Sequence, residues 1–320
     1  LYPFVLITSL FFLWGFAHAI LDVLNKHFQE LLTITRTHSA MIQATMYMGY
    51  FIMAIPAGLF INRHGYRRGV VLGLLLYGTG SLLFIPGQYI ASFNMFLFSL
   101  FVIGCGLTFL ETAANPYVTE LGARETAASR LNFAQSFNGL GCIFAPILTG
   151  LLLFSDEDKG ASGNVALPYA VMGVIVLLAA LAFMRVRLPE IPHEEEVDSE
   201  GHRVGLWAHK LFVFGLVALF AYEVSEISIN SFFINYVTEV GWMNARDASL
   251  VLSFGGLGLF MVGRFVGSWI MRRVRAEKML FWCATGTVIT TLLVILDLGS
   301  VSFAVMLSKP LCSPPFLLSP

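Results

Sequence analysis

Glu111 is an acidic residue within a long, mostly apolar stretch of this sequence. It follows sixteen uncharged residues, from Met95 to Leu110. A carboxylate at membrane depth is costly unless it faces a cavity or a partner, which makes it a functional candidate. Asn115 lies four residues later, on the same helical face, and Pro116 then removes a backbone donor. We expect a polar cavity wall here, with a carboxyl that takes up and releases a proton.

Asp22 is a second acid within an apolar segment, and His18 precedes it by four residues on the same face. We expect Asp22 to take part in proton coupling and His18 to contribute to the same site. The alternative for both acids is a structural group held by arginine or by hydrogen bonds. For His18 the alternative is a histidine satisfied within the packing.

Three amides recur along the stretch "RLNFAQSFNGLG". Asn132, Gln135 and Asn138 are spaced at i, i+3 and i+6 and form one polar stripe on a helix. Amides both donate and accept hydrogen bonds, which suits sugar hydroxyls. The alternative is hydrogen bonding between helices, worth only ~1 kcal/mol per bond. We expect substrate contacts from Gln135 and Asn138, and from Asn132 nearer the cytoplasmic end.

A later apolar segment also carries acids. Glu223, Glu226 and Asn230 are spaced to share part of one helical face. Glu226 lies deeper in that segment than Glu223. The sequence therefore predicts Glu226 as a wall residue of the same cavity.

The composition places these residues in a polytopic membrane protein. The chain is 57% hydrophobic and 12% charged, with a mean hydropathy of +0.77, whereas soluble domains average about 25% charged residues. Basic residues occur in short scattered clusters, which argues against a nucleic-acid surface. The four cysteines show no metal-ligand spacing. We expect no metal and no cofactor.

Nine apolar segments are long enough to span a bilayer. Their length and their lack of strict alternation favour helices over a closed barrel. The predicted spans are 4–30, 39–62, 69–88, 94–120, 128–153, 168–186, 211–237, 247–271 and 279–298.

The connections differ in basic charge. Thirteen Lys and Arg residues fall in one set of connections and four in the opposite set, which predicts a cytoplasmic N-terminus. The larger set comprises Arg63, Arg67, Arg68, Arg124, Arg130, Arg185, Arg187, Arg203, Lys210, Arg272, Arg273, Arg275 and Lys278, and the smaller set Lys26, Arg36, Lys159 and Arg246.

A polar stretch divides the chain into two parts. We expect a six-helix half over 1–186, a cytoplasmic linker over 187–206 and a partial second half over 207–307. An internal repeat supports the division, since "GLFINRHGYRRG" and "GSWIMRRVRAEK" match at an offset of 209 residues. Repeated prolines over 308–320 are incompatible with a spanning helix. We therefore expect an aberrant tail there, and a chain truncated at both ends.

The first copy of this repeat lies at a predicted cytoplasmic turn and is suited to holding helices together. We expect a conformational latch rather than a substrate contact from its small, polar and basic residues. These are Gly58, Asn62, Arg63, Gly65, Arg67 and Arg68.

The same stretch resembles the helix 2–3 signature of the major facilitator superfamily, with Asn62 where that signature has Asp. "SLFFLWGFAHAILDVLNKHFQE", "LETAANPYVTELG" and "LNFAQSFNGLG" resemble the fucose permease branch of that superfamily. The resemblance implies an all-α major facilitator fold. It also implies that Glu111 and Asp22 match the branch's proton-coupling acids, and that Gln135 and Asn138 match its sugar-binding amides.

The resemblance implies proton-coupled sugar uptake by alternating access, with L-fucose as the leading substrate. A glucose or galactose transporter of the same branch is the alternative, because His18 and Leu21 depart from the branch pattern. A non-transporting sugar sensor and a polytopic membrane enzyme are the rivals from other classes; the enzyme lacks any recognisable nucleophile–base or metal spacing. We expect a monomer in the inner (plasma) membrane whose partners are a sugar, a proton and the lipid bilayer.

Overall fold

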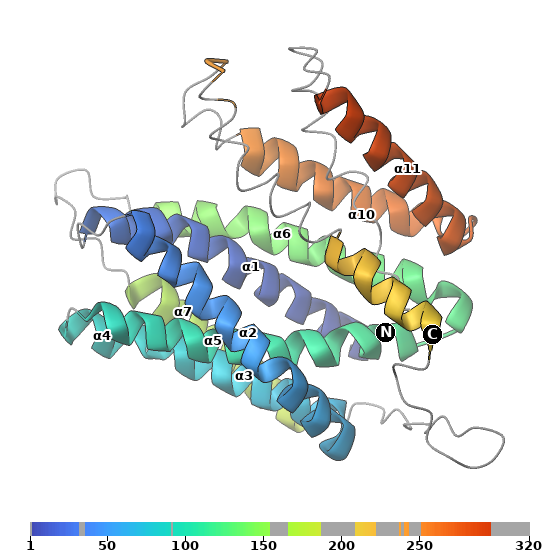
Figure 1. The fold of residues 1–320 in the computed structure, drawn as a ribbon. Helices are drawn as coiled ribbons and strands as arrows, with labels where there is room; N and C mark the ends of the chain where they lie inside the picture. The colour runs from blue at the N-terminus through green and yellow to red at the C-terminus, as the bar shows by residue number, and fades with distance from the viewer. Residues whose placement is uncertain are drawn as a thin grey trace.

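The protein is a bundle of long helices in the computed structural model, which describes residues 2–31, 36–90, 92–153, 166–186, 209–221, 237, 240–242 and 251–295 (Figure 1). Every regular element in these ranges is helical. The helices are α1 (Tyr2–Leu31), α2 (Arg36–His64), α3 (Tyr66–Leu82), α4 (Phe84–Ile90), α5 (Phe93–Glu120), α6 (Ala127–Leu153), α7 (Ala166–Arg185), α10 (Gly258–Ile270) and α11 (Ala276–Ile295), with a short helix Lys210–Ala221 and a π-helical segment Val251–Leu257.

The first six predicted spans differ from the observed helices by at most three residues at either end. The third span is interrupted, because α3 ends at Leu82 and α4 begins at Phe84. Pro86 lies in the first turn of α4. A proline ring clashes with the carbonyl four residues earlier and its nitrogen cannot donate, so the helix is reset before it.

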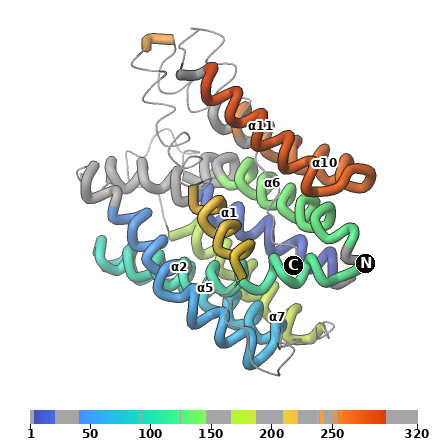
Figure 2. Tube along the Cα trace, turned by 45° about the vertical axis from the view of Figure 1, so that its right-hand side comes forward, coloured from blue at the N-terminus to red at the C-terminus, as the bar shows by residue number. Residues whose placement is uncertain are grey.

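The packing follows two layers joined through α5 and α6. Helix α5 packs on α2 and α3, α3 packs on α7, and α6 packs on α1 and, on its other side, on α10. Figure 2 shows α10 and α11 lying beyond α6, on the opposite side from α3 and α7. The buried core runs continuously through α1, α2, α3, α5, α6 and α7.

Glycines allow the closest of these crossings. A Cβ added at Gly15 of α1 would lie 2.0 Å from the carbonyl oxygen of Asn138 in α6. A Cβ added at Gly104 of α5 would lie 2.4 Å from the carbonyl oxygen of Met46 in α2. Helices in membranes associate mainly through such small-residue contacts, because lipid offers no hydrophobic force between them.

The outer surface of the bundle is apolar. Phe51 is 85% exposed and Leu59 is 66% exposed on α2, and α7 shows Val174 and Leu178 in the same way. By length and composition, four helical stretches of the described chain could cross a membrane: Met41–His64, Tyr66–Ile90, Phe93–Glu120 and Ala166–Arg185. This surface suits lipid, which is as apolar as the side chains facing it.

Candidate functional site

Two predicted polar residues meet between α5 and α6. The Gln135 side-chain amide donates to Asn115 Oδ1 at 3.3 Å, across twenty residues of sequence. Gln135 is buried, whereas Asn115 and Asn138 are partly exposed. Glu111 lies one turn before Asn115 on α5 and is also partly exposed. The structure thus joins the predicted acid and two of the predicted amides into one polar patch on facing helices.

The Gly15 crossing brings α1 to this patch. Besides the close approach to Asn138, the thiol of Cys142 lies 3.3 Å from the Gly15 carbonyl oxygen and 3.9 Å from Asn138 Oδ1. Helix α1 is therefore held directly against the amide-bearing face of α6. His18 follows Gly15 by three residues on the same helix.

His18 belongs to an aromatic group on α1 and α2 that also contains Trp14 and Tyr50. The indole Nε1–H of Trp14 donates to the Tyr50 hydroxyl at 2.9 Å. The His18 ring meets the Trp14 ring edge-on with centroids 5.7 Å apart, and lies 5.9 Å from the Tyr50 ring. His18 Nδ1 also lies 3.2 Å from the Trp14 carbonyl oxygen.

Tyr50 was not predicted from the sequence. It lies in the apolar run "MYMGYFIMAIP", between Tyr47 and Phe51. This sequence context does not distinguish it from an aromatic residue that faces lipid. In the structure its hydroxyl accepts a hydrogen bond from Trp14 of α1, and its ring lies beside His18. Tyr50 is thereby the α2 member of the aromatic group that contains His18.

Asn132 lies on the predicted amide stripe but faces a different partner. Its Oδ1 accepts a hydrogen bond from Arg264 Nη1 of α10 at 3.2 Å, and both side chains are buried. One turn earlier, Ser129 Oγ donates to the Ser268 carbonyl at 2.8 Å, and Ser268 Oγ donates to the Ser129 carbonyl at 2.9 Å. These bonds join helices on opposite sides of the predicted linker.

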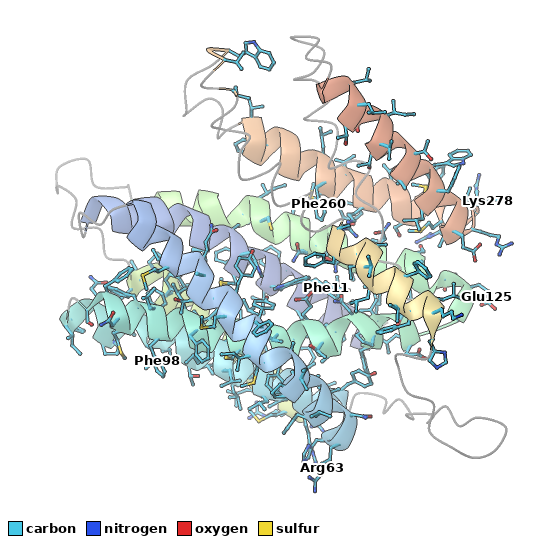
Figure 3. All side chains as sticks on the ribbon, viewed as in Figure 1. Phe11, Arg63, Phe98, Glu125, Phe260 and Lys278 are labelled. Carbon is cyan, nitrogen blue, oxygen red and sulfur yellow. The ribbon has the colours of Figure 1, made fainter. Side chains whose placement is uncertain are left out.

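Arg264 was also not predicted. It is a single charge within "LGLFMVGRFVGSWI", and a lone cation in an apolar run is the signal that could have found it. Its guanidinium carbon lies 4.7 Å from the centre of the Phe260 ring. Phe260 lies at the junction of α10 with α6 (Figure 3), within van der Waals distance of a Cβ built at Gly139.

The predicted latch residues gather at one end of the bundle. Asn62, Arg63 and Arg68 are exposed. Figure 3 shows Arg63 at the C-terminal end of α2. Arg67 donates to the backbone carbonyls of Phe183 and Met184, which ties the start of α3 to the end of α7. This arginine joins helices within the first six, and its latch role stays a prediction.

The turn around Gly58 and Gly65 has open space. Gly65 adopts φ +85° between α2 and α3, a backbone conformation that favours glycine, and a Cβ built at Gly58 meets nothing within 4 Å. The equivalent glycine of the repeat, Gly267, is more crowded, since a Cβ there would lie 2.9 Å from Asn132 Nδ2. The second copy of the repeat therefore packs against α6 at this glycine.

Two further predictions fall outside what the structure describes. Asp22 lies on α1, but its side chain is outside the described part of the chain, and Glu226 lies in an undescribed range altogether. Their roles in the site stay predictions.

Comparison with known proteins places this geometry in a family. Residues 4–315 match the Major Facilitator Superfamily. The chain is 34% identical over 302 residues to the glucose/galactose transporter of Brucella abortus (strain 9-941), covering 92% of this chain and 73% of that protein. It is also 34% identical over 303 residues to the L-fucose-proton symporter of Escherichia coli (strain K12), covering 87% of this chain and 69% of that protein.

A solved structure is similar over nearly the whole chain. The crystal structure of FucP, a major facilitator superfamily transporter in the outward conformation, superposes with a TM-score of 0.83. That likeness has 31% sequence identity and covers 98% of this chain and 82% of the FucP chain. The chain therefore belongs to the Major Facilitator Superfamily of membrane transport proteins, in the same branch as these relatives.

Proposed function

We propose that the protein is a sugar:proton symporter, with L-fucose as its leading substrate. The observation that carries the proposal is the polar patch in which Gln135 bonds Asn115, one turn from Glu111. Amides can donate to and accept from the hydroxyls of one sugar, while a carboxyl can exchange a proton in the same space. Two relatives of equal identity, one named for L-fucose and one for glucose and galactose, support the sugar class.

Glu111 is the proposed proton carrier of this site. A carboxylate inside a bundle is stable when hydrogen-bond donors or a cavity compensate for the lost water. Sugar hydroxyls bound by Gln135, Asn115 and Asn138 would supply such donors beside it. Binding of sugar and the charge of Glu111 are then linked through shared hydrogen bonds. Asp22 and His18 on α1, and Glu226 beyond the linker, are proposed to complete the site.

Helix α6 connects this site to the proposed transport movement. Its residues Gln135 and Asn138 belong to the sugar site, while Ser129 and Asn132, further toward its N-terminus, bond α10. Separation of α10 from α6 at this end would open the site to the side on which α6 begins. We place that side in the cytoplasm, with the N-terminus, from the excess of Lys and Arg in its connections.

The decisive experiment measures transport and proton movement together. Cells expressing the protein receive labelled L-fucose, D-galactose or D-glucose in weakly buffered medium, while external pH is recorded. Uptake of L-fucose with simultaneous alkalinisation supports the proposal in full. Alkalinisation with D-glucose or D-galactose instead selects the alternative substrate. Sugar binding without any proton movement would overturn the symport mechanism and favour a sensor.

The second candidate substrate, a hexose such as glucose or galactose, is favoured by one sequence observation. His18 and Leu21 differ from the fucose permease pattern within the sequence of α1. A competition assay separates the two: excess unlabelled L-fucose should suppress uptake of labelled hexose if both share the site with fucose preferred.

A further inference from the structure

Arg130 joins the end of α5 to the beginning of α6. Its Nε donates to the Val118 carbonyl at 3.2 Å, its Nη2 to the Thr119 carbonyl at 2.6 Å, and its Nη1 to the Ala123 carbonyl at 2.9 Å. Nη1 also donates to the Thr126 hydroxyl. A guanidinium carries these donors in one rigid, planar fork. A single side chain of α6 therefore holds the last turn of α5 and the connection between the two helices.

The acceptors on α5 are carbonyls that the helix itself leaves without a donor. The last four carbonyls of an α-helix have no intrahelical partner, and α5 ends at Glu120. Val118 is 0% exposed and Thr119 is 8% exposed, so water has little access to them. A buried carbonyl without a donor costs free energy, and the guanidinium removes that cost here. Gly122 leaves room for it, since a Cβ built there would lie 3.0 Å from Arg130 Nη1.

Pro116 makes this last turn of α5 depend on α6. Because the proline nitrogen cannot donate, the Thr112 carbonyl receives no backbone hydrogen bond from position 116. The turn beyond the proline is therefore joined less firmly to the body of α5, while Arg130 bonds it to α6. Asn115, whose Oδ1 accepts from Gln135 at 3.3 Å, directly precedes that proline. The position of Asn115 is thus set from the α6 side as well as from α5.

The proposed sugar site spans the two layers of helices. Helix α5 packs mainly on α2 and α3, whereas α6 packs mainly on α1 and α10. Glu111 and Asn115 belong to the first layer, and Gln135 and Asn138 belong to the second. One sugar can contact both sets only if the two layers keep a fixed separation beside it. Arg130 is placed to fix that separation, because it bonds α5 and α6 together next to the amide pair.

We propose that Arg130 is a positioning residue for the sugar site. Its hydrogen bonds to the end of α5 hold Asn115 within reach of Gln135, and it does not contact the sugar itself. The inference rests on the proposed function, since it takes these two amides to bind the sugar. It gives Arg130 a purpose beyond that of a basic residue at the predicted cytoplasmic end of α6.

The test is sugar uptake by Arg130→Gln and Arg130→Lys, with KM and maximal rate per folded molecule measured separately. We expect KM to rise about tenfold in Arg130→Gln, the scale of one lost hydrogen bond, and the maximal rate to fall by less than about threefold. Arg130→Lys should raise KM less, because an ammonium keeps the charge but lacks the fork that reaches every acceptor. This variant decides the question if Arg130→Gln does not fold. A purely structural role would reduce the amount of folded protein and leave the KM of the remaining transporter unchanged.

The double variant Arg130→Gln/Gln135→Ala tests whether the effect passes through the amide pair. If Arg130 acts by positioning Asn115 against Gln135, the increase in KM should be clearly smaller than the product of the two single increases. An increase equal to that product would contradict this route. Arg185→Gln is the matched control, because it removes an exposed arginine at the end of α7 and should leave KM and maximal rate unchanged.

A measurement without sugar separates this inference from the proposed function. Amide hydrogen exchange at the end of α5 and in its connection to α6 should be faster in Arg130→Gln and unchanged in Arg185→Gln. Unchanged exchange in Arg130→Gln would show that Arg130 does not hold this turn, and faster exchange with an unchanged KM would overturn the positioning role. Absence of sugar uptake by the unmodified protein would overturn the proposed function instead, and the exchange measurement would still test the hold of Arg130 on α5.

Discussion

At the scale of single residues, the site depends on polar groups that each complete a partner's hydrogen bonding. Gln135 is 3% exposed and donates to Asn115, so removal of the Asn115 amide would leave a buried donor of Gln135 unsatisfied. Glu111 stays partly exposed beside them. Partial exposure is what a group must have if sugar and proton are to reach it. The chemistry of the patch is therefore open to direct test by single substitutions.

Glu111→Gln keeps the size of the side chain and removes its ability to ionise. We expect net uptake driven by a proton gradient to be abolished, since no proton is carried, while counterflow exchange of sugar persists. The measurement is uptake of labelled sugar in vesicles with and without an imposed pH gradient. Glu125→Gln, an exposed acid beyond the end of α5, is the control and should behave as the unmodified protein. Gradient-driven accumulation by Glu111→Gln would contradict the assignment.

Gln135→Ala removes an amide that we propose to bind sugar, and it leaves Asn115 without its donor. We expect the KM for sugar to rise about tenfold, corresponding to the ~1–1.5 kcal/mol of a hydrogen bond, with a smaller change in maximal rate. Ser136→Ala is the neighbouring control, because the Ser136 hydroxyl bonds only within its own helix, to the Asn132 carbonyl at 3.0 Å. A KM unchanged in Gln135→Ala would place that side chain outside the sugar site.

At the scale of helices, glycine contacts decide which faces meet. Helix α1 lies on α6 where Gly15 and Gly141 remove side chains from the interface, and a Cβ at Gly141 would lie 2.2 Å from the Phe12 carbonyl oxygen. Because both backbones are rigid helices, neither can yield locally to make room. The same crossing that packs the bundle also places Gly15 directly against Asn138 of the predicted amide stripe, so packing and site geometry are linked on this face.

Gly15→Ala should therefore destabilise the fold rather than alter the chemistry alone. A Cβ placed 2.0 Å from the Asn138 carbonyl oxygen forces the helices apart, and overpacking of this kind costs about 1–3 kcal/mol or more. We expect a clearly lower Tm of the detergent-purified protein, measured by a fluorescence unfolding assay. Gly215→Ala on the Lys210–Ala221 helix, where a Cβ meets nothing within 4 Å, should leave the Tm unchanged or slightly higher.

At the scale of the whole molecule, contacts join α6 to α10 across the predicted linker. The reciprocal bonds of Ser129 and Ser268, with Asn132 and Arg264 beside them, bring α6 and α10 into direct contact. The FucP structure that the chain resembles was solved in the outward conformation. Closure by α6 and α10 on the side where α6 begins is consistent with that state if this side is cytoplasmic.

A disulfide across this contact should lock the transporter. The Ser129 and Ser268 Oγ atoms lie 3.2 Å apart, close enough for a bond between cysteine sulfurs after small rotations. In the Ser129→Cys/Ser268→Cys variant, oxidation should stop sugar uptake while sugar still binds from outside, and a reductant should restore uptake. Each single variant, treated identically, is the control. Full transport by the cross-linked protein would show that α6 and α10 need not separate.

Hydropathy alone predicts the helices, because a chain within lipid must satisfy its backbone hydrogen bonds internally. It also singled out Glu111, Asn115 and Gln135, since polar groups in an apolar helix are conspicuous by their cost. Periodicity, however, grouped Asn132 with Gln135 and Asn138, and the structure turns Asn132 toward Arg264.

Which polar residues meet depends on how the helices pack, and the sequence does not predict it. The pairs Gln135–Asn115, Tyr50–Trp14 and Ser129–Ser268 are 20, 36 and 139 residues apart in the chain. No local pattern encodes such distances, because they depend on which glycine-lined faces pack together. For that reason Tyr50 resembles an ordinary aromatic residue in the sequence, and only the packing of α1 on α2 shows that its hydroxyl accepts a hydrogen bond from Trp14.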